Sequence, residues 1–403
     1  MFYRIYRKAT AVFIAFLSLV MAVVFVFQYF LPDRFYVSGS ELDFSSSYGK
    51  IISFDTNYGK AKEVLSRNDN SFSAKAKLLG ILPLKEVSVT VSDEKIVTVC
   101  GTPFGVKMFT DGVLVVDFSE IETENGRRCP ASESGLLEGD LIKAINKTDV
   151  FRNEDVAEII EKSEGKELSF SILRNGKSME ISLIPEMLKD QSGYKAGFWV
   201  RDSSAGIGTL TFYDPEDLSF AGLGHAVCDI DTGTVLPFSS GEIVPAAITK
   251  IKKGVSGTPG ELGGAFIGKD DLGIVKINNE TGLYGTLEYT IEGIEMPVAH
   301  KQDIYEGSAV ILSTVEGTEA EEYDILIEKI ALSDDSLTKN MVIKVVDEEL
   351  IEATGGIVQG MSGSPIIQDG KLIGAVTHVL VNDPTKGYGI FAENMLEMSK
   401  KCG

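Results

Sequence analysis

The segment Gly360–Pro365, with the sequence Gly-Met-Ser-Gly-Ser-Pro, places a serine between two glycines and shortly before an apolar run from Leu372 to Leu380. Glycine adopts backbone conformations that other residues avoid, so a turn of this kind exposes the Ser362 hydroxyl and points backbone N–H groups at one place. The amides of Gly360 and Ser362 could then hold an oxygen that becomes negative during acyl transfer. A plain Gly/Ser hairpin turn has the same composition. The segment therefore predicts a nucleophile only if a base and an acid precede it.

Composition limits the class of protein. The 403 residues allow two or three domains, and 44% hydrophobic with 24% charged residues is ordinary for a folded chain. A net charge of -21 argues against binding to nucleic acid and against attachment to anionic lipid through clustered basic residues. The four cysteines are scattered without a C-x-x-C pair, which favours free or buried thiols over a disulfide framework or a zinc site.

The N-terminus predicts a membrane anchor over residues 1–35. Basic residues precede an uncharged stretch from Ala9 to Leu31, which is long enough to cross a bilayer and ends without a small-residue cleavage site. A cleaved signal peptide is the alternative. The positive flank predicts a cytoplasmic N-terminus with the bulk of the chain outside. Residues 36–94 follow as a Ser/Asn/Asp-rich stalk with a small β element near its end.

Residues 95–187 resemble a PDZ domain. Phe104, Gly105 and Val106 fit the x-Φ-Gly-Φ loop that binds a peptide carboxylate in that family, and the segment 131–142 resembles its A-x-x-A-G-L-x-x-G-D-x-I pattern. The sequence also predicts a helix at 153–162 and a hairpin with an Asn175-Gly176 turn. Such a domain binds a peptide by adding it to a strand edge, although it can also serve only as packing for its neighbour.

Residues 190–403 are Gly-rich and strand-rich, with turn residues at intervals typical of β-barrels. Of only three histidines, His225 lies in a small-residue segment well before Ser362, which suits a base. We expect His300 on a surface loop and His378 as a strand residue that forms a wall or core. The fold expected is mostly β: a transmembrane helix, an α+β PDZ domain and a chymotrypsin-like double β-barrel peptidase domain.

The acid of a His, Asp, Ser arrangement must lie between His225 and Ser362. Asp229 and Asp231 are close to His225, but a turn around residues 231–233 accounts for both without a catalytic role. Asp347 ends an apolar strand one hairpin before the nucleophile, where a carboxylate could hold an imidazole in one tautomer, although a solvated Asp-Glu-Glu turn is the alternative. We favour Asp347.

The anchor, the PDZ-like segment, Gly-Leu-Gly-His225 and the block from Thr354 through Ser362 to Ile367 together resemble the SpoIVB peptidase family. The resemblance covers nearly the whole chain. It implies a catalytic triad of His225, Asp347 and Ser362, with an oxyanion hole at Gly360 and Ser362. No metal or organic cofactor is expected.

The resemblance also implies a role in sporulation signalling. Family members sit in the forespore inner membrane and face the intermembrane space, where they cleave themselves. They then cut a membrane-bound regulator of an intramembrane metalloprotease, which triggers late sigma-factor processing in the mother cell. The PDZ domain would bind a peptide ligand.

Two alternatives remain open at this stage. An HtrA-like extracytoplasmic quality-control protease also combines these domains, but there the PDZ domain follows the protease. A catalytically inactive membrane-tethered PDZ adaptor would not need both His225 and the complete Ser362 turn.

Overall fold

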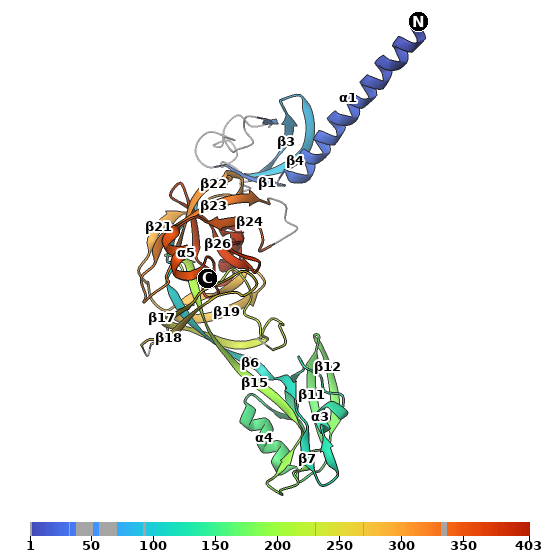
Figure 1. Ribbon diagram of the computed structural model, residues 1–403, viewed down its shortest axis with the longest axis vertical. Helices are drawn as coiled ribbons and strands as arrows, with labels where there is room; N and C mark the ends of the chain where they lie inside the picture. Colours follow the sequence, from blue (N-terminus) through green and yellow to red (C-terminus); the bar gives the residue numbers. More distant parts are fainter. Residues whose placement is uncertain are drawn as a thin grey trace.

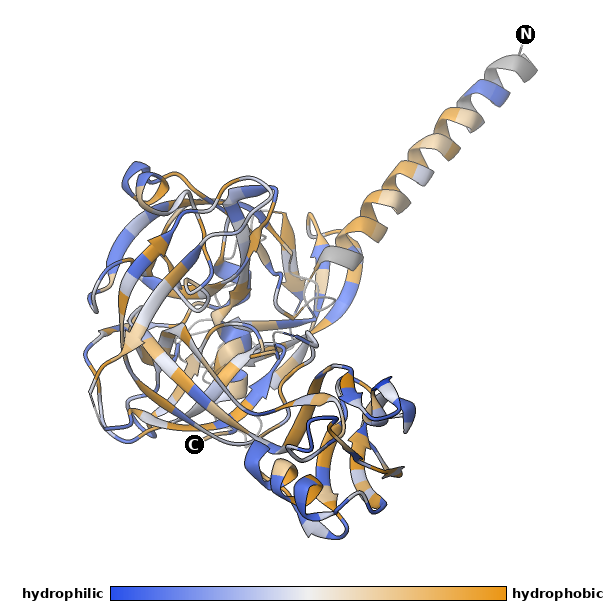
Figure 2. Ribbon diagram, turned by 60° about the horizontal axis from the view of Figure 1, so that its bottom comes forward, coloured by the Kyte–Doolittle hydropathy of each residue, from blue (hydrophilic) through white to orange (hydrophobic). Residues whose placement is uncertain are grey.

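The computed structural model describes residues 2–31, 33–37, 51–55, 71–91, 94–229, 231–268, 270–331 and 337–403. Its first element, helix α1 (Phe2–Phe30), projects away from the rest of the molecule (Figure 1). Figure 2 shows mostly apolar residues along this helix. The segment Tyr6–Gln28 is long and apolar enough to span a membrane, and it is not buried by the remainder of the chain.

A four-stranded sheet follows the helix, in the order β1 (Arg34–Val37), β4 (Leu82–Val91), β3 (Ser71–Leu78) and β2 (Ile52–Asp55). Alternate residues of β3 are buried, and this face packs with Val24 and Phe27 of α1 into a small core. The described part of the predicted stalk is thus a folded sheet. Residues 38–50 and 56–70, which hold most of the Ser/Asn-rich sequence, lie outside the described residues.

This sheet contacts the body of the molecule through Tyr36. The Tyr36 N–H donates to Gln302 Oε1 at 2.8 Å, Gln302 Nε2 donates to the Tyr36 carbonyl at 2.6 Å, and the tyrosine ring stacks on His300 with centroids 4.5 Å apart. The expectation that His300 is a surface loop residue is therefore wrong, because its side chain is only 13% exposed. It precedes the single turn η1 (Lys301–Asp303).

Six strands pair in succession to form a first closed ring, and the last strand pairs back with the first. Their order is β6 (Pro103–Phe118), β17 (Phe238–Lys252), β19 (Gly273–Asn279), β20 (Gly282–Leu287), β16 (Ser219–Gly222) and β15 (Phe198–Tyr213). Their inward side chains, among them Phe104 and Phe220, form one core. Beside the ring, this sheet includes β5 (Ile96–Val99), β18 (Glu261–Phe266) and β21 (Ile294–Pro297), and it continues from β6 into the α/β unit described below.

A second closed barrel follows in the chain. It contains β22 (Gly307–Ser313), β23 (Glu321–Ile330), β24 (Met341–Val345), β27 (Asp383–Phe391), β26 (Lys371–Leu380) and β25 (Pro365–Gln368). Helix α5 (Glu348–Thr354) lies between β24 and β25 in sequence, and helix α6 (Ala392–Ser399) follows β27 and packs its buried face between the barrels. The prediction of a mostly β chain with β-barrels is confirmed.

An α/β unit interrupts the first barrel between β6 and β15. Helix α4 (Asn153–Lys162) and the hairpin with its Asn175-Gly176 turn confirm the sequence prediction, and both turn residues have positive φ. The unit has its own core and lies at the end of the molecule opposite α1 (Figure 1). Its elements are β7 (Ile121–Thr123), β8 (Gly126–Arg128), α3 (Pro130–Glu133), β9 (Leu141–Ile145), β10 (Thr148–Asp149), α4, β11 (Leu168–Arg174), β12 (Lys177–Leu183), β13 (Glu186–Met187) and β14 (Tyr194–Lys195).

The predicted carboxylate loop at Phe104, Gly105 and Val106 is wrong. These residues lie inside β6, which pairs with β15 on one side and β17 on the other, so the backbone is engaged on both edges. The Phe104 ring is buried in the barrel core. The predicted boundaries 95–187 and 190–403 are also wrong in one respect, because β5 and β6 belong to the first barrel and the α/β unit is nested within it.

Candidate active site

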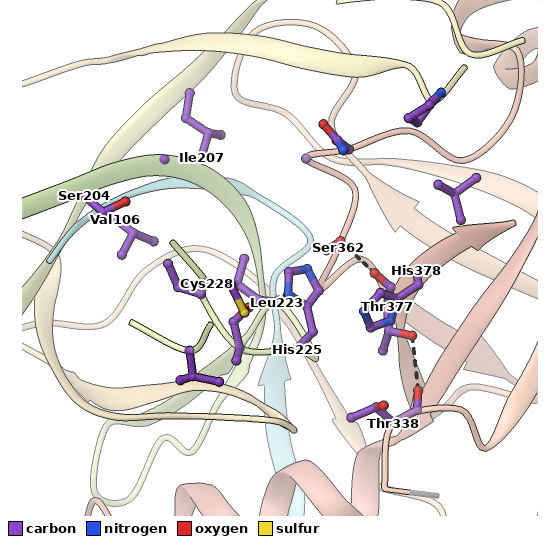
Figure 3. Close-up of a pocket in the computed structure, with 18 of the residues that line it drawn as sticks. Val106, Ser204, Ile207, Leu223, His225, Cys228, Thr338, Ser362, Thr377 and His378 are labelled. Carbon is purple, nitrogen blue, oxygen red and sulfur yellow. Dashed lines mark hydrogen bonds between the residues drawn. The ribbon is translucent and has the colours of Figure 1, made fainter. Parts of the chain in front are cut away.

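Ser362 lies on a tight turn between α5 and β25. Gly360 and Gly363 have φ of 98° and 95°, which L side chains avoid. A Cβ on Gly363 would also approach the Thr209 carbonyl oxygen to 2.1 Å, so only glycine fits there. The Ser362 hydroxyl is partly exposed and donates to the Thr377 carbonyl of β26 at 2.8 Å (Figure 3).

His225 follows β16 of the first barrel and faces the same space as Ser362. Its Nδ1 lies 2.8 Å from the carbonyl oxygen of Ala226. Because a carbonyl only accepts, this contact places the proton on Nδ1 and leaves Nε2 as the acceptor, as a general base requires. Burial lowers the pKa of His225 below its ordinary value, and the Ala226 carbonyl opposes that shift only in part. The imidazole is therefore neutral at pH 7.

His378 on β26 also lines this space, in agreement with the expectation of a strand residue that forms a wall or core. Its ring centroid lies 5.1 Å from that of His225, and Figure 3 shows Ser362 near both rings. Desolvation by the surrounding walls, together with the charges of His225 and Lys339, lowers the pKa of His378 to about 4. Whether a strand residue faces a cavity or the core depends on register, so the sequence left these two places for His378 open.

Two backbone amides beside Ser362 are directed away from protein acceptors. The Gln359 carbonyl accepts from Leu262 N–H at 2.8 Å, and the Met361 carbonyl accepts from Ser364 N–H at 2.9 Å. In a trans peptide the N–H group points opposite to the carbonyl of the preceding residue. The N–H groups of Gly360 and Ser362 therefore point away from the partners of the Gln359 and Met361 carbonyls. Within the part of the chain that the structure describes, neither donates to an acceptor, whereas the N–H groups of Met361 and Gly363 both do.

Ser362 and the two histidines line one cavity of about 1050 Å³ between the barrels. The first barrel contributes residues of β15 and the segment that follows β16, and the second contributes the turn before β25 and the end of β26. The charged residues on its walls are Arg201, Glu280 and Lys339, and Cys228 supplies a thiol. The walls also include several apolar side chains, namely Val106, Ile207, Leu223, Val358, Val379 and Val381.

The structure does not bring Asp347 to this cavity. Asp347 is the N-cap of α5, where its carboxylate accepts from the Leu350 N–H at 2.9 Å and, more weakly, from the Asp324 N–H at 3.4 Å. The cavity walls do not include it. This arrangement does not support Asp347 as the orienting acid, because its carboxylate caps α5 and lies outside the cavity walls, and the assignment stays a prediction. The Ala226 carbonyl fixes the His225 tautomer instead.

The described residues contain no group of three or more His, Cys, Asp or Glu side chains arranged to hold a metal ion. All four cysteines are free, with Cys100 and Cys402 buried.

Residues 192–396 match the family model described as SpoIVB peptidase S55, which is about half of the chain. The chain belongs to this peptidase family. The matched region carries Ser362, His225 and His378, yet it begins just before β14, the last strand of the α/β unit, and so omits β5 and β6 of the first barrel.

Two curated relatives share parts of this peptidase's sequence. It is 30% identical over 135 residues to the Regulator of sigma-W protease RasP from Bacillus subtilis (strain 168), covering 34% of this chain and 26% of the relative. It is 38% identical over 60 residues to the Probable protease eep from Enterococcus faecalis (strain ATCC 700802 / V583), covering 15% of this chain and 14% of the relative. The chain thus matches about a quarter or less of the length of these relatives.

Among solved structures, the peptidase is similar to the active form of the Rv3671c protease from M. tuberculosis. The sequence identity is 13% and the TM-score 0.30, over 50% of this chain and 75% of that one. A likeness this distant adds nothing to the geometry described above.

Proposed function

We propose that this protein is a membrane-anchored serine endopeptidase in which Ser362 is the nucleophile and His225 the general base. The observation that carries the proposal is the cavity between the barrels. It holds a glycine-flanked serine, a neutral imidazole with its proton on Nδ1, and two backbone amides that have no acceptor among the described residues. These are the parts that acyl transfer requires.

In the proposed mechanism, the Ser362 hydroxyl turns from the Thr377 carbonyl toward His225. Nε2 takes the hydroxyl proton as Oγ bonds to the scissile carbonyl carbon, and the N–H groups of Gly360 and Ser362 hold the resulting oxyanion. The C–N bond then breaks and Nε2 returns the proton to the leaving amine. Water releases the acyl group by the same steps in reverse. The Ala226 carbonyl keeps the imidazole in the required tautomer throughout.

The substrates we propose follow from the family. They are the protein itself and a membrane-bound regulator of an intramembrane metalloprotease, cut on the extracytoplasmic side of the forespore inner membrane during sporulation. Helix α1 would keep the cavity close to that membrane, because the sheet that follows it is joined to the body of the molecule through Tyr36 and Gln302. This tether favours membrane proteins over soluble ones as substrates.

We further propose that the nested α/β unit is a PDZ-like module that binds a peptide. The first residues of β15, Phe198 to Val200, pair with β6 on one edge. Helix α4 packs against β14 and β15, and its buried residues Val156 and Ile160 share a core with Val200. An extended peptide could add to the remaining edge of β15 beside α4, with Gly197 and its positive φ opening the groove.

The nucleophile can be tested with the full-length protein in detergent micelles and a fluorophosphonate probe. We expect labelling at Ser362, and self-cleavage detected by mass spectrometry of the termini. Ser362→Ala should lose both while its melting temperature stays unchanged. Ser364→Ala is the matched control, because Ser364 lies on the same turn but is buried and donates to Ser313 Oγ at 3.0 Å. A Ser362→Ala protein that still trims itself would refute the assignment, and a wild-type protein that neither labels nor trims would favour an inactive adaptor.

A further inference from the structure

Arg201 on β15 connects that strand to the segment that carries His225. Its Nη1 donates to Asp229 Oδ2 at 2.5 Å and its Nη2 donates to Asp231 Oδ2 at 2.6 Å. Asp229 lies four residues after His225, and its side chain is fully buried. Arg201 therefore makes a charged contact with the base-bearing segment from outside that segment.

The buried carboxylate makes this contact strong. Asp229 Oδ1 accepts the N–H groups of Asp231 and Thr232 at 3.1 and 2.9 Å, so the carboxylate also organises the loop behind it. A buried carboxylate without a cation is strongly unfavourable, so the loop holds this position only while a guanidinium faces it. Arg201 meets the carboxylates with two nitrogens, a geometry that lysine cannot reproduce.

The loop is in turn continuous with His225. The N–H of Leu236 donates to the Val227 carbonyl at 3.1 Å, and Cys228 and Val235 form a bridge, so residues 227–229 and 231–236 pair as the two sides of a hairpin-like segment. His225 lies directly before this segment and bonds to the carbonyl of Ala226. Asn278 also holds Val227, accepting its N–H at 2.8 Å and donating to its carbonyl at 2.9 Å. We expect a shift of the segment to displace the Ala226 carbonyl and the imidazole as far as this anchor allows.

We propose that Arg201 is a positioning residue that holds His225 in place through Asp229. This inference rests on the proposed role of His225 and assigns a residue that controls it. Arg201 acts from β15, the strand that begins in the α/β unit. The other charged or titratable groups on the same cavity walls are His378, Cys228, Lys339 and Glu280, and among the described residues none of them forms a hydrogen bond with Asp229.

The test compares Arg201→Met with a matched control, Arg174→Met. Arg174 pairs with Asp140 in the α/β unit through two bonds of 2.6 Å, and the exposures of that pair (24% and 1%) nearly equal those of Arg201 and Asp229 (28% and 0%). Both substitutions remove a guanidinium from a buried carboxylate, so both should lower the melting temperature. Only Arg201→Met should disturb the catalytic centre.

Two measurements are made on the full-length protein in detergent, below the melting temperatures. NMR titration of histidine-labelled protein, with His225 assigned from a His225→Gln variant, should show its pKa rising toward the ordinary histidine value in Arg201→Met and unchanged in Arg174→Met. The fluorophosphonate labelling rate should fall about 10- to 100-fold in Arg201→Met alone, as expected for a displaced catalytic group. In Arg201→Lys the labelling rate should lie between those of Arg201→Met and the wild type.

An unchanged His225 titration in Arg201→Met would overturn the proposal, whatever the labelling rate. If wild-type protein does not label, the proposed peptidase function fails, while the NMR titration still decides whether Arg201 positions His225. A shifted titration with an unchanged labelling rate would also overturn it, since His225 would then move without consequence for Ser362.

Discussion

The hydroxyl of Thr209 donates a hydrogen bond of 3.0 Å to the carbonyl oxygen of Gly360, and the Thr209 N–H donates to the carbonyl of Ser362 at 3.2 Å. Thr209 belongs to the first barrel and the nucleophile turn to the second. Two residues later, the Thr211 hydroxyl donates to the Gly363 carbonyl at 2.7 Å. Strand β15 thus holds three carbonyls of the turn, those of Gly360, Ser362 and Gly363, and so fixes the conformation of the turn that carries Ser362.

Replacing Thr209 by valine keeps the shape of the side chain but leaves the Gly360 carbonyl without its donor. We expect a loss of about 1–3 kcal/mol in the free energy of unfolding, because a buried acceptor becomes unsatisfied. The value of kcat should fall about tenfold with little change in KM, less than the roughly 100- to 1000-fold loss on removing an oxyanion donor itself. Thr209→Ser should recover most of the activity. A rise in KM alone would contradict this account.

Asp347 is expected to behave as a helix cap. Asp347→Ala should lower the free energy of unfolding by about 0.5–2 kcal/mol, whereas Asp347→Asn should be nearly neutral because asparagine caps equally well. Peptidase activity of Asp347→Asn should stay within a few-fold of wild type. An orienting acid would instead lose about 10⁴-fold in kcat on the same change without loss of stability. Thermal unfolding and steady-state kinetics on the two variants separate these cases.

The pH dependence of activity should identify the base. Because burial lowers the pKa of His225 from 6.5, the acid limb of kcat/KM should lie below that value. Because the unfolded chain protonates this histidine more readily than the folded protein does, the free energy of unfolding has its full value above the unfolded-state pKa. Part of it is lost as the pH falls through the folded-state pKa of His225. His378 stays neutral down to about pH 4. His378→Asn should therefore keep the acid limb, whereas His225→Asn should abolish activity. The reverse pattern would make His378 the base.

We expect substitution of Phe104 to lower the free energy of unfolding and to leave peptide binding by the α/β unit unchanged. Its ring is about 1% exposed and meets Phe220 edge-on with centroids 6.5 Å apart. Truncation to alanine should cost roughly 3–5 kcal/mol in the free energy of unfolding. Denaturant unfolding checks this value. A folded Phe104→Ala protein with normal stability but lost peptide affinity would restore the loop interpretation.

Local features of this chain could be predicted from its sequence. The turn at Ser362, helix α4 and the Asn175-Gly176 hairpin depend on neighbouring residues, and all three lie where the pattern indicates. The capping role of Asp347 was also readable, since an Asp followed by Glu348 and Glu349 is a helix start.

Features set by distant pairing could not be predicted. A Phe-Gly-Val stretch is a binding loop in one context and a buried strand in another, and the partners that decide it lie on β15 and β17. The nesting of the α/β unit follows from the same pairings. The place of His378 depends on the register of β26 against β27, where the pairing shifts around Val376 and Val379.

The nested arrangement sets an order of assembly. As the chain emerges from its N-terminus, β9 can pair with Val113 and Leu114 of β6, but residues 103–110 of β6 have no partner until β15 and β17 have followed, and such distant pairing is slow. The nucleophile turn comes later still and depends on carbonyl contacts with β15. The turn that carries Ser362 can therefore form only when synthesis is nearly complete, which delays peptidase activity until most of the chain is present.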